Sequence, residues 1–287
     1  MVDASIIRLR DGRRLAYLDA PDAAGIPVLF VHGLPSCRLM RPDAALTAKL
    51  GARLITFDRP GFGQSDASPG RSLVDTADDV VALLDNLGID RVYVAAPSGG
   101  GPPALAFAHR APDRIRAVAL IGAAAPMDAP GALAGFTLER RVGFWLAGHW
   151  PGLLRWEISR RTGPGRDTRK FLASYTKHNP AVDQAILARP EIRDMFLASY
   201  AESLRQGVDA FAWELQLAAR PWGFPLTDIR VPVAVWHGGK DNSVPPAMGK
   251  RLAAAIPDAQ LRLLPDESHL FFLSRWREIL ADLLSLG

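Results

Sequence analysis

Two kinds of hydrophobic pattern follow one another along the chain. Near the N-terminus, residues 5–10 and 13–19 alternate between apolar and polar side chains on either side of Asp11-Gly12. A pair of this type tolerates the positive φ angles of a tight turn, so the alternation predicts an antiparallel hairpin. Continuously apolar runs follow at 28–31, 54–57, 92–95 and 117–121. Runs without alternation are typical of strands that are covered on both faces.

Segments of helical length lie between these predicted strands. We expect helices over residues 39–50, 72–87 and 99–110. The second has a capping-box start, because Ser72 is followed three residues later by Asp75, and Gly88 provides its stop. Strands that alternate with helices in this way predict a doubly wound, mostly parallel sheet of the α/β class with crossover helices.

The alternation lapses after residue 121. It resumes with strands predicted at 231–236 and 260–264 and helices predicted at 246–256 and 273–286. The intervening residues 127–228 show helical periodicity at 171–175 and 181–217 and hold Trp145, Trp150, Trp156, Trp213 and Trp222, five of the seven tryptophans. We therefore predict a helical cap at 127–228, inserted into a core made of residues 1–126 and 229–287.

The composition is that of an ordinary globular protein. Of the 287 residues, 48% are hydrophobic and 22% are charged, which excludes collagen-like, coiled-coil and wholly disordered chains. The net charge of +4 is too small to indicate a nucleic-acid partner. The longest nearly uncharged stretch, 117–138, is interrupted by Asp128 and two prolines, so we predict no membrane span.

Cysteine usage bears on the compartment. The single cysteine, Cys37, cannot form a disulfide within the chain, and a framework without disulfides is typical of cytosolic proteins. Residues 1–17 carry charges every few positions and lack the apolar core of roughly 7–15 residues that a secretory signal needs. We therefore expect a cytoplasmic location.

The clearest chemical signal lies at residues 92–101. A predicted strand runs directly into the turn Ala96-Pro97-Ser98-Gly99-Gly100, and a predicted helix begins at once. A serine on such an elbow has a strained backbone, which requires small residues two positions before and after it, and Ala96 and Gly100 are small. The start of the helix then directs backbone N–H groups at the attack site, where they stabilise an oxyanion. Ser98 is thus the candidate nucleophile; the alternative is a glycine-rich turn that only joins strand to helix.

A serine at its normal pKa is a poor nucleophile and needs a base, with an acid that orients the base. Asp241 follows the predicted strand at 231–236, in a loop at the carboxyl end of a parallel strand, where open sheets place their sites. His269 follows the predicted strand at 260–264. The order Ser98, Asp241, His269, with these strand contexts, is the order expected for a triad on an α/β-hydrolase sheet.

Five stretches carry a family resemblance. They are His-Gly-Leu-Pro at 32–35, Asp-Arg-Pro-Gly-Phe-Gly-Gln-Ser at 58–65, Ser-Gly-Gly-Gly-Pro at 98–102, Gly-Gly-Lys-Asp at 238–241 and Ser-His at 268–269. On these residues the chain resembles an α/β hydrolase with a cap domain, over essentially its whole length. It departs from the family at Ala96, where glycine is usual, and at Pro97, where His, Gln or Trp is commoner. These departures leave the role of the serine intact, but the specificity of subfamilies that use the preceding side chain does not transfer.

The resemblance implies further roles. The backbone N–H groups of Leu34, which follows the His-Gly pair, and of Gly99, which follows the nucleophile, would form the oxyanion hole. Asp58 and Arg59 resemble loop-fixing residues of the family and are assigned no chemistry. His32 lies at the end of a buried strand, where we expect a structural hydrogen-bonding residue.

Other candidates compete with these assignments. Asp128 lies just past the predicted strand at 117–121, where some members of the family place the acid, but the loop that carries Asp241 matches better. Cys37 is expected to be a packing residue, because a reactive thiol needs its own histidine and a depressed pKa. The remaining histidines are expected to be structural: His109, His149, His178 and His237.

These residues predict a serine hydrolase that cleaves carboxylic esters of a largely apolar small molecule through an acyl-enzyme on Ser98. The resemblance leaves open C–C bond, lactone or amide hydrolysis and perhydrolysis by the same triad, and also a ligand-binding protein without catalysis. A serine nucleophile argues against the family's dehalogenases and epoxide hydrolases, which use an aspartate. The sequence has no phosphate-binding loop and no pair of histidines at zinc-ligand spacing, so no cofactor or metal is expected.

Overall fold

The predicted strands form one mixed sheet in the computed structural model, which describes residues 4–19, 24–129, 131–163 and 167–287. Within these residues the sheet has eight strands in the order β1-β2-β4-β3-β5-β6-β7-β8. Their bounds are β1 Ser5–Arg8, β2 Arg14–Leu18, β3 Ile26–Phe30, β4 Ala52–Phe57, β5 Val92–Pro97, β6 Ile115–Ile121, β7 Val233–Gly238 and β8 Gln260–Leu264. β2 pairs antiparallel with β1 and β4, and the pairings from β4 across to β8 are parallel. The predicted sheet with its N-terminal antiparallel hairpin is confirmed.

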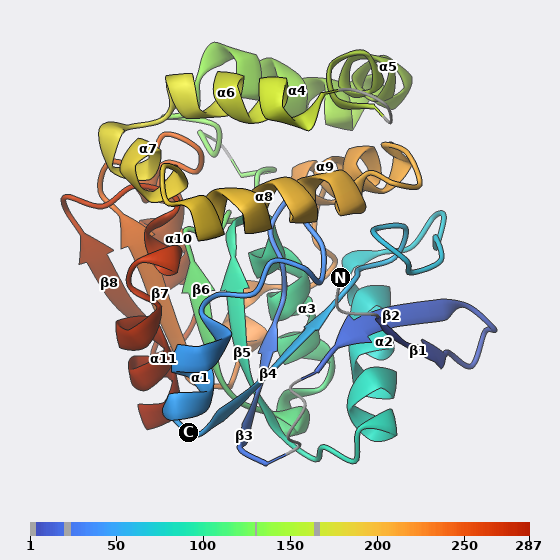
Figure 1. Ribbon diagram of the computed structural model, residues 1–287, viewed down its shortest axis with the longest axis vertical. Coiled ribbons are helices and arrows are strands. Elements are labelled where there is room, and N and C mark those ends of the chain that lie inside the picture. The colour runs from blue at the N-terminus through green and yellow to red at the C-terminus, as the bar shows by residue number, and fades with distance from the viewer. Residues whose placement is uncertain (1–3, 20–23, 130, 164–166) are drawn as a thin grey trace.

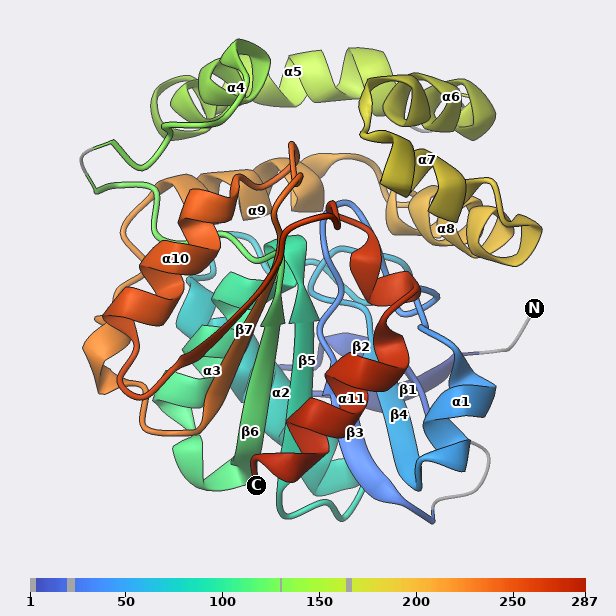
Figure 2. The same ribbon diagram turned by 90° about the vertical axis from the view of Figure 1, so that its left-hand side faces the viewer.

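Successive strand residues enter two separate hydrophobic cores. In β3, Val28 and Phe30 pack on one side of the sheet and Leu29 on the other. The side with Leu29 is covered by α2 (Leu73–Asn86), α3 (Gly101–Arg110) and α10 (Pro246–Ala255), and the other side by α1 (Ala44–Lys49) and α11 (Trp276–Ser285) (Figure 2). Because both sides are buried, the central strands need apolar residues at every position, which explains their uninterrupted runs.

A helical layer is inserted between β6 and β7. Its described helices are α4 (Leu138–His149), α5 (Pro151–Thr162), α6 (Thr168–His178), α7 (Ala181–Leu187), α8 (Pro190–Ser203) and α9 (Asp209–Ala219). In Figures 1 and 2 these helices lie above the carboxyl ends of the central strands. A helical insert over residues 138–219 is consistent with the predicted cap.

Three predicted helices differ from the structure at their bounds. The helix predicted at 39–50 begins only at Ala44, because Pro42 disfavours helical backbone before it and Asp43 caps the helix by accepting a hydrogen bond from Leu46 N at 2.9 Å. The helical pattern at 181–217 is divided into α7, α8 and α9. The helix predicted at 273–286 begins at Trp276.

The length of the helices bears on membrane insertion. The longest helices in the described part of the chain, α2 and α8, have 14 residues each. A bilayer span needs about 20 predominantly apolar residues, so none of the described helices can cross a membrane.

Candidate active site

Ser98 lies where β5 turns into α3. β5 ends at Pro97, a single 3-10 turn spans Ser98–Gly100, and α3 follows directly. Ser98 has a φ angle of 53°, and Asp258 is the only other non-glycine residue in the described ranges with a positive φ. Residues other than glycine avoid this region unless surrounding contacts hold them there. The chain therefore makes the sharp turn that the sequence predicts at this serine.

Close packing fixes the turn. A Cβ added to Gly100 would lie 1.9 Å from the carbonyl oxygen of Val31, and one added to Gly101 would lie 2.6 Å from the Cβ of Ala123. These positions therefore require glycine, since any side chain would push the start of α3 away from the strands. The close approach places the N-terminus of α3 directly behind Ser98.

The loop after β3 brings the predicted oxyanion donors to the same place. A Cβ added to Gly33 would lie 3.2 Å from Ser98 Cβ and 3.8 Å from Ser98 Oγ. The side chain of Leu34 lies against Gly99, within 2.7 Å of the position that a Cβ would take there. Leu34 and Gly99, predicted from positions far apart in the sequence, are thus neighbours that line one cavity with Ser98.

A buried guanidinium supports both loops from behind. Arg59 donates from Nη2 to the carbonyl oxygen of Gly33 at 3.1 Å and from Nη1 to that of Gly99 at 3.2 Å. The Gly33 carbonyl belongs to the same planar peptide group as the Leu34 N–H, so this bond also fixes the direction of that N–H. The predicted loop-fixing role of Arg59 is therefore directed at the candidate oxyanion hole, which the sequence did not indicate.

The charge of Arg59 is balanced from the cap. Glu214 on α9 is 2% exposed, accepts a hydrogen bond from Arg59 Nη1 at 2.7 Å, and also pairs with Arg71. Burial lowers the pKa of Arg59 to about 10, against the opposing effect of the Glu214 carboxylate. Two buried cations thus share one carboxylate. No local sequence pattern indicates this cluster, because Arg59 and Glu214 are 155 residues apart.

Asp241 and His269 meet beyond the carboxyl ends of β7 and β8. Asp241 Oδ2 lies 2.7 Å from His269 Nδ1. Asp241 Oδ1 accepts backbone hydrogen bonds from Ser243 and Val244, each at 2.8 Å. Both members of the pair are buried. When Nδ1–H donates to the carboxylate, Nε2 of the imidazole carries no proton and can accept one.

The cap also holds the loop that carries the histidine. Asp183 on α7 accepts hydrogen bonds from the Ser268 hydroxyl at 2.9 Å, from His269 N at 3.2 Å and from Leu270 N at 2.9 Å. Sequence reasoning missed Asp183. Its only signal is an acidic residue in a helical pattern, which looks the same as a residue on a solvated face.

The surroundings of His269 set its proton affinity. Burial and, to a smaller extent, the charge of Arg140 lower the pKa of the imidazole. The carboxylates of Asp241 and Asp183 together raise it by more, so the pKa lies above its usual value.

The three predicted residues lie at one end of the sheet. β6 runs between β5 and β7, and Gly122 directly follows it. A Cβ added to Gly122 would lie 3.3 Å from Asp241 Oδ2 and 3.4 Å from His269 Nδ1, so the pair sits beside the strand next to that of Ser98. Among the hydrogen bonds of the described residues, none joins Ser98 Oγ to the imidazole.

Ser98 lines a cavity of about 120 Å³ beneath the cap. Most of the lining is apolar and includes Leu34, Pro102, Met127, Phe136, Phe144, Phe211 and Leu215. Its charged lining residues are Arg140 on α4 and Glu214 on α9. The aromatic lining comes from phenylalanines, and none of the five cap tryptophans takes part. Three of them, Trp145, Trp150 and Trp156, are instead 50%, 60% and 58% exposed.

The sequence matches a known protein family over most of its length. Residues 26–275 match the family described as alpha/beta hydrolase fold. The chain belongs to this α/β-hydrolase family. The match spans both sides of the cap and every residue of the site described above.

Known proteins similar to this chain have names that refer to different substrates. Pimeloyl-[acyl-carrier protein] methyl ester esterase from Neisseria meningitidis is 27% identical over 88% of this chain and 90% of its own. 2-Hydroxymuconate semialdehyde hydrolase from Pseudomonas putida is 26% identical over 85% of this chain and 81% of its own. The structure of a thermophilic esterase from Thermogutta terrifontis is 27% identical and covers 99% of this chain and 98% of its own, with a TM-score of 0.65. Hydrolysis is what these names share.

The residues that compete with Ser98, Asp241 and His269 for a catalytic role in this α/β hydrolase lie in surroundings that do not suit that role. Asp128 is exposed, and it is Asp241 that hydrogen-bonds His269. Cys37 is fully buried, and burial raises the pKa of its thiol to about 12, which favours the unreactive protonated form. His32 accepts a hydrogen bond from Arg59 N at 3.3 Å, in keeping with a structural role.

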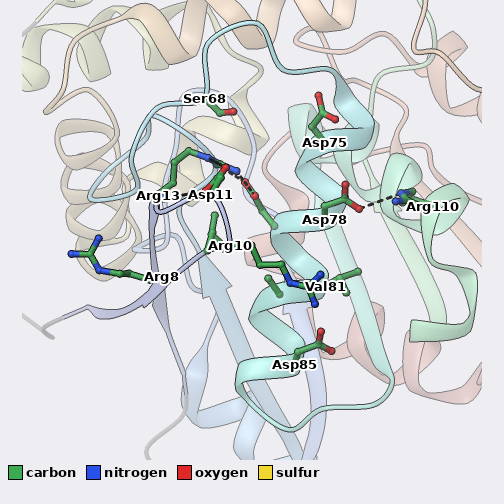
Figure 3. Close-up of a pocket in the computed structure, with 13 residues that line it drawn as sticks. Arg8, Arg10, Asp11, Arg13, Ser68, Asp75, Asp78, Val81, Asp85 and Arg110 are labelled. Carbon is green, nitrogen blue, oxygen red and sulfur yellow. Dashed lines mark hydrogen bonds and ion pairs between the residues drawn. The ribbon is translucent and has the colours of Figure 1, made fainter.

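A larger cavity, of about 690 Å³, lies between the β1–β2 hairpin and α2 (Figure 3). Its lining is mostly charged, and several charges are paired across it: Arg13 with Asp79 at 2.7 Å and Arg110 with Asp78 at 3.2 Å. It contains none of the predicted site residues. We therefore place the candidate active site at the smaller cavity, which Ser98, Leu34 and Gly99 line.

Proposed function

We propose that this α/β hydrolase cleaves carboxylic esters of small molecules through an acyl-enzyme on Ser98. The observation that supports this most is the left-handed backbone of Ser98. It presents a serine to a cavity that Leu34 and Gly99 also line, at the sheet end where His269 is bonded to Asp241.

In the first half-reaction, Ser98 Oγ attacks the ester carbonyl carbon and gives its proton to His269 Nε2. The carbonyl oxygen becomes an oxyanion and accepts hydrogen bonds from the N–H groups of Leu34 and Gly99. The C–O bond to the alcohol then breaks, and the imidazolium returns the proton to the leaving oxygen. Asp241 holds the ring in the required tautomer and stabilises its positive charge.

In the second half-reaction, water attacks the acyl-enzyme carbonyl and gives one proton to His269 Nε2. The new oxyanion accepts hydrogen bonds from the same two N–H groups. The bond to Ser98 Oγ breaks, the imidazolium reprotonates the serine, and the acid leaves. One ester and one water thus become one acid and one alcohol.

The cavity supports a small substrate that is largely apolar except where it meets the charged lining residues. Its volume of about 120 Å³ is well below the roughly 300–1,000 Å³ of pockets that hold drug-sized ligands. The phenylalanines of the lining exclude water from the carbonyl, which strengthens the hydrogen bonds to the oxyanion.

Labelling with a fluorophosphonate tests the proposal. We expect intact mass to show one adduct on the wild-type protein and none on Ser98→Ala, with hydrolysis of short p-nitrophenyl esters lost in the same variant. Ser174→Ala, which changes an exposed serine of α6, is the matched control and should react like the wild type. Undiminished esterase activity of Ser98→Ala, or absence of the adduct from the wild type, would refute the proposal.

A further inference from the structure

Arg140 is a cation inside the candidate active site. It lies in the first turn of α4, four residues before Phe144, so both side chains project from the same face of the helix, and both line the cavity of Ser98. Its Nη2 donates to the hydroxyl of Ser243 at 3.3 Å. Arg141, the next residue, is exposed.

The described contacts of Arg140 compensate its charge only weakly. The guanidinium is partly withdrawn from water, and the first turn of a helix carries positive partial charge, which disfavours a cation. No ion pair in the described part of the chain joins Arg140 to a carboxylate. A cation in this position has a reason to be there if it binds an anionic group of the substrate.

Glu214, the other charged residue of the lining, does not repel an anion strongly. Glu214 uses one carboxylate oxygen for Arg59 and the other for Arg71. Its single negative charge is therefore exceeded by the two buried cations beside it. Glu214 therefore adds no net negative charge to the lining, and Arg140 is the charged group that an anionic substrate would meet there.

We propose that Arg140 binds a carboxylate of the substrate, so that the preferred substrates are short esters that carry a free carboxylate. This inference rests on the proposed ester hydrolysis and names the substrate class for it. A planar guanidinium matches the geometry of a carboxylate and binds it through two parallel hydrogen bonds. Ser98 and Arg140 line one small cavity, so the ester carbonyl and the carboxylate must be separated by only a few bonds.

Two esters of equal size test the charge alone. Monomethyl succinate is an anion at pH 8, and methyl succinamate is its neutral amide counterpart. We expect the wild type to have a kcat/KM about 10- to 100-fold higher for the anion, as for a hydrogen bond between charged groups. In Arg140→Gln this ratio should fall to near one, mainly through KM, and Arg140→Lys should keep part of it. Arg141→Gln, the matched control, should keep the wild-type ratio.

The outcomes separate this inference from the function on which it rests. Equal rates for the two esters in the wild type, or an unchanged ratio in Arg140→Gln, would overturn the carboxylate site. A wild-type protein that reacts with fluorophosphonate at Ser98 but hydrolyses neither ester would overturn it too, while leaving the proposed nucleophile standing. Absence of fluorophosphonate labelling would overturn both.

Discussion

At the scale of single residues, the two aspartates that the sequence offers as the acid have different surroundings. Asp241 is buried and hydrogen-bonds His269, whereas Asp128 is exposed. We predict that Asp241→Asn lowers kcat/KM for an ester by about 10⁴-fold, because an amide at this position favours the wrong tautomer of the imidazole. Asp128→Asn should remain close to the wild type. Steady-state kinetics of the two variants measures both effects, and a larger loss at Asp128 would reverse the assignment.

The surroundings of His269 predict how activity depends on pH. Burial lowers the pKa of His269, but Asp241 and Asp183 raise it by more, to above the usual 6.5. A general base must be unprotonated, so activity should be lost as the pH falls through this raised pKa. We predict that kcat/KM rises with pH with an apparent pKa above 6.5, and that Asp183→Asn moves this limb to lower pH. A profile that stays flat from pH 8 down to pH 6 would contradict the prediction.

Sequence alone could indicate residues whose signals are local. Ser98 stands between a strand and a helix, and Asp241 and His269 directly follow strands, so their positions can be read without the fold. Asp183 and Glu214 carry no such signal. Each acts on a residue 86 or more positions away, and the packing of the cap on the sheet decides which residues they meet.

At the scale of elements, local chemistry decides which bounds are predictable. The helix predicted at 72–87 is α2, because its capping box is present: Ser72 N donates to Asp75 Oδ2 at 2.7 Å and Asp75 N donates to Ser72 Oγ at 3.3 Å. The helix predicted at 39–50 starts late, because its apolar pattern begins before Pro42 and a proline disfavours helical backbone at the residue that precedes it. Apolar periodicity thus finds an element, and caps and prolines set its ends.

The junction of β5 and α3 permits an element-scale prediction. A methyl group at Gly100 would lie 1.9 Å from the Val31 carbonyl oxygen, whereas one at Gly143, within α4, meets nothing within 4 Å. We predict that Gly100→Ala lowers the free energy of unfolding by at least about 1–3 kcal/mol and abolishes activity, because α3 must move away from the strand. Gly143→Ala should raise it by about 0.5–1 kcal/mol, since alanine favours the helix. Urea unfolding compares the two; equal effects would mean that the junction is loosely packed.

At the scale of the whole molecule, the cap is part of the candidate site as well as its cover. Asp183 of α7 holds the loop of His269, and Glu214 of α9 balances Arg59 behind the oxyanion loop. Both are carboxylates of the cap that accept hydrogen bonds from residues of the core. The helical pattern predicts that an insert exists, but these contacts depend on how the insert lies on the sheet. Residues of the cap and of the core therefore build the candidate site together. A substitution in the cap is expected to alter both the catalytic rate and the stability of the protein.

Glu214 gives the sharpest test of this coupling. Glu214→Gln removes the negative charge that Arg59 and Arg71 share. These two side chains are 0% and 3% exposed, so the variant leaves two buried cations beside each other. We predict a loss of about 3–5 kcal/mol in the free energy of unfolding, the cost of breaking a buried ion pair from one side. kcat should fall as well, because Arg59 then loses the partner that keeps it on the Gly33 carbonyl. Asp209→Asn, on the same helix, breaks an exposed pair with Arg155 and should change neither quantity appreciably, since water screens that pair. If urea unfolding and kinetics gave the two variants the same small effect, the cap would be a cover that the oxyanion loop does not need.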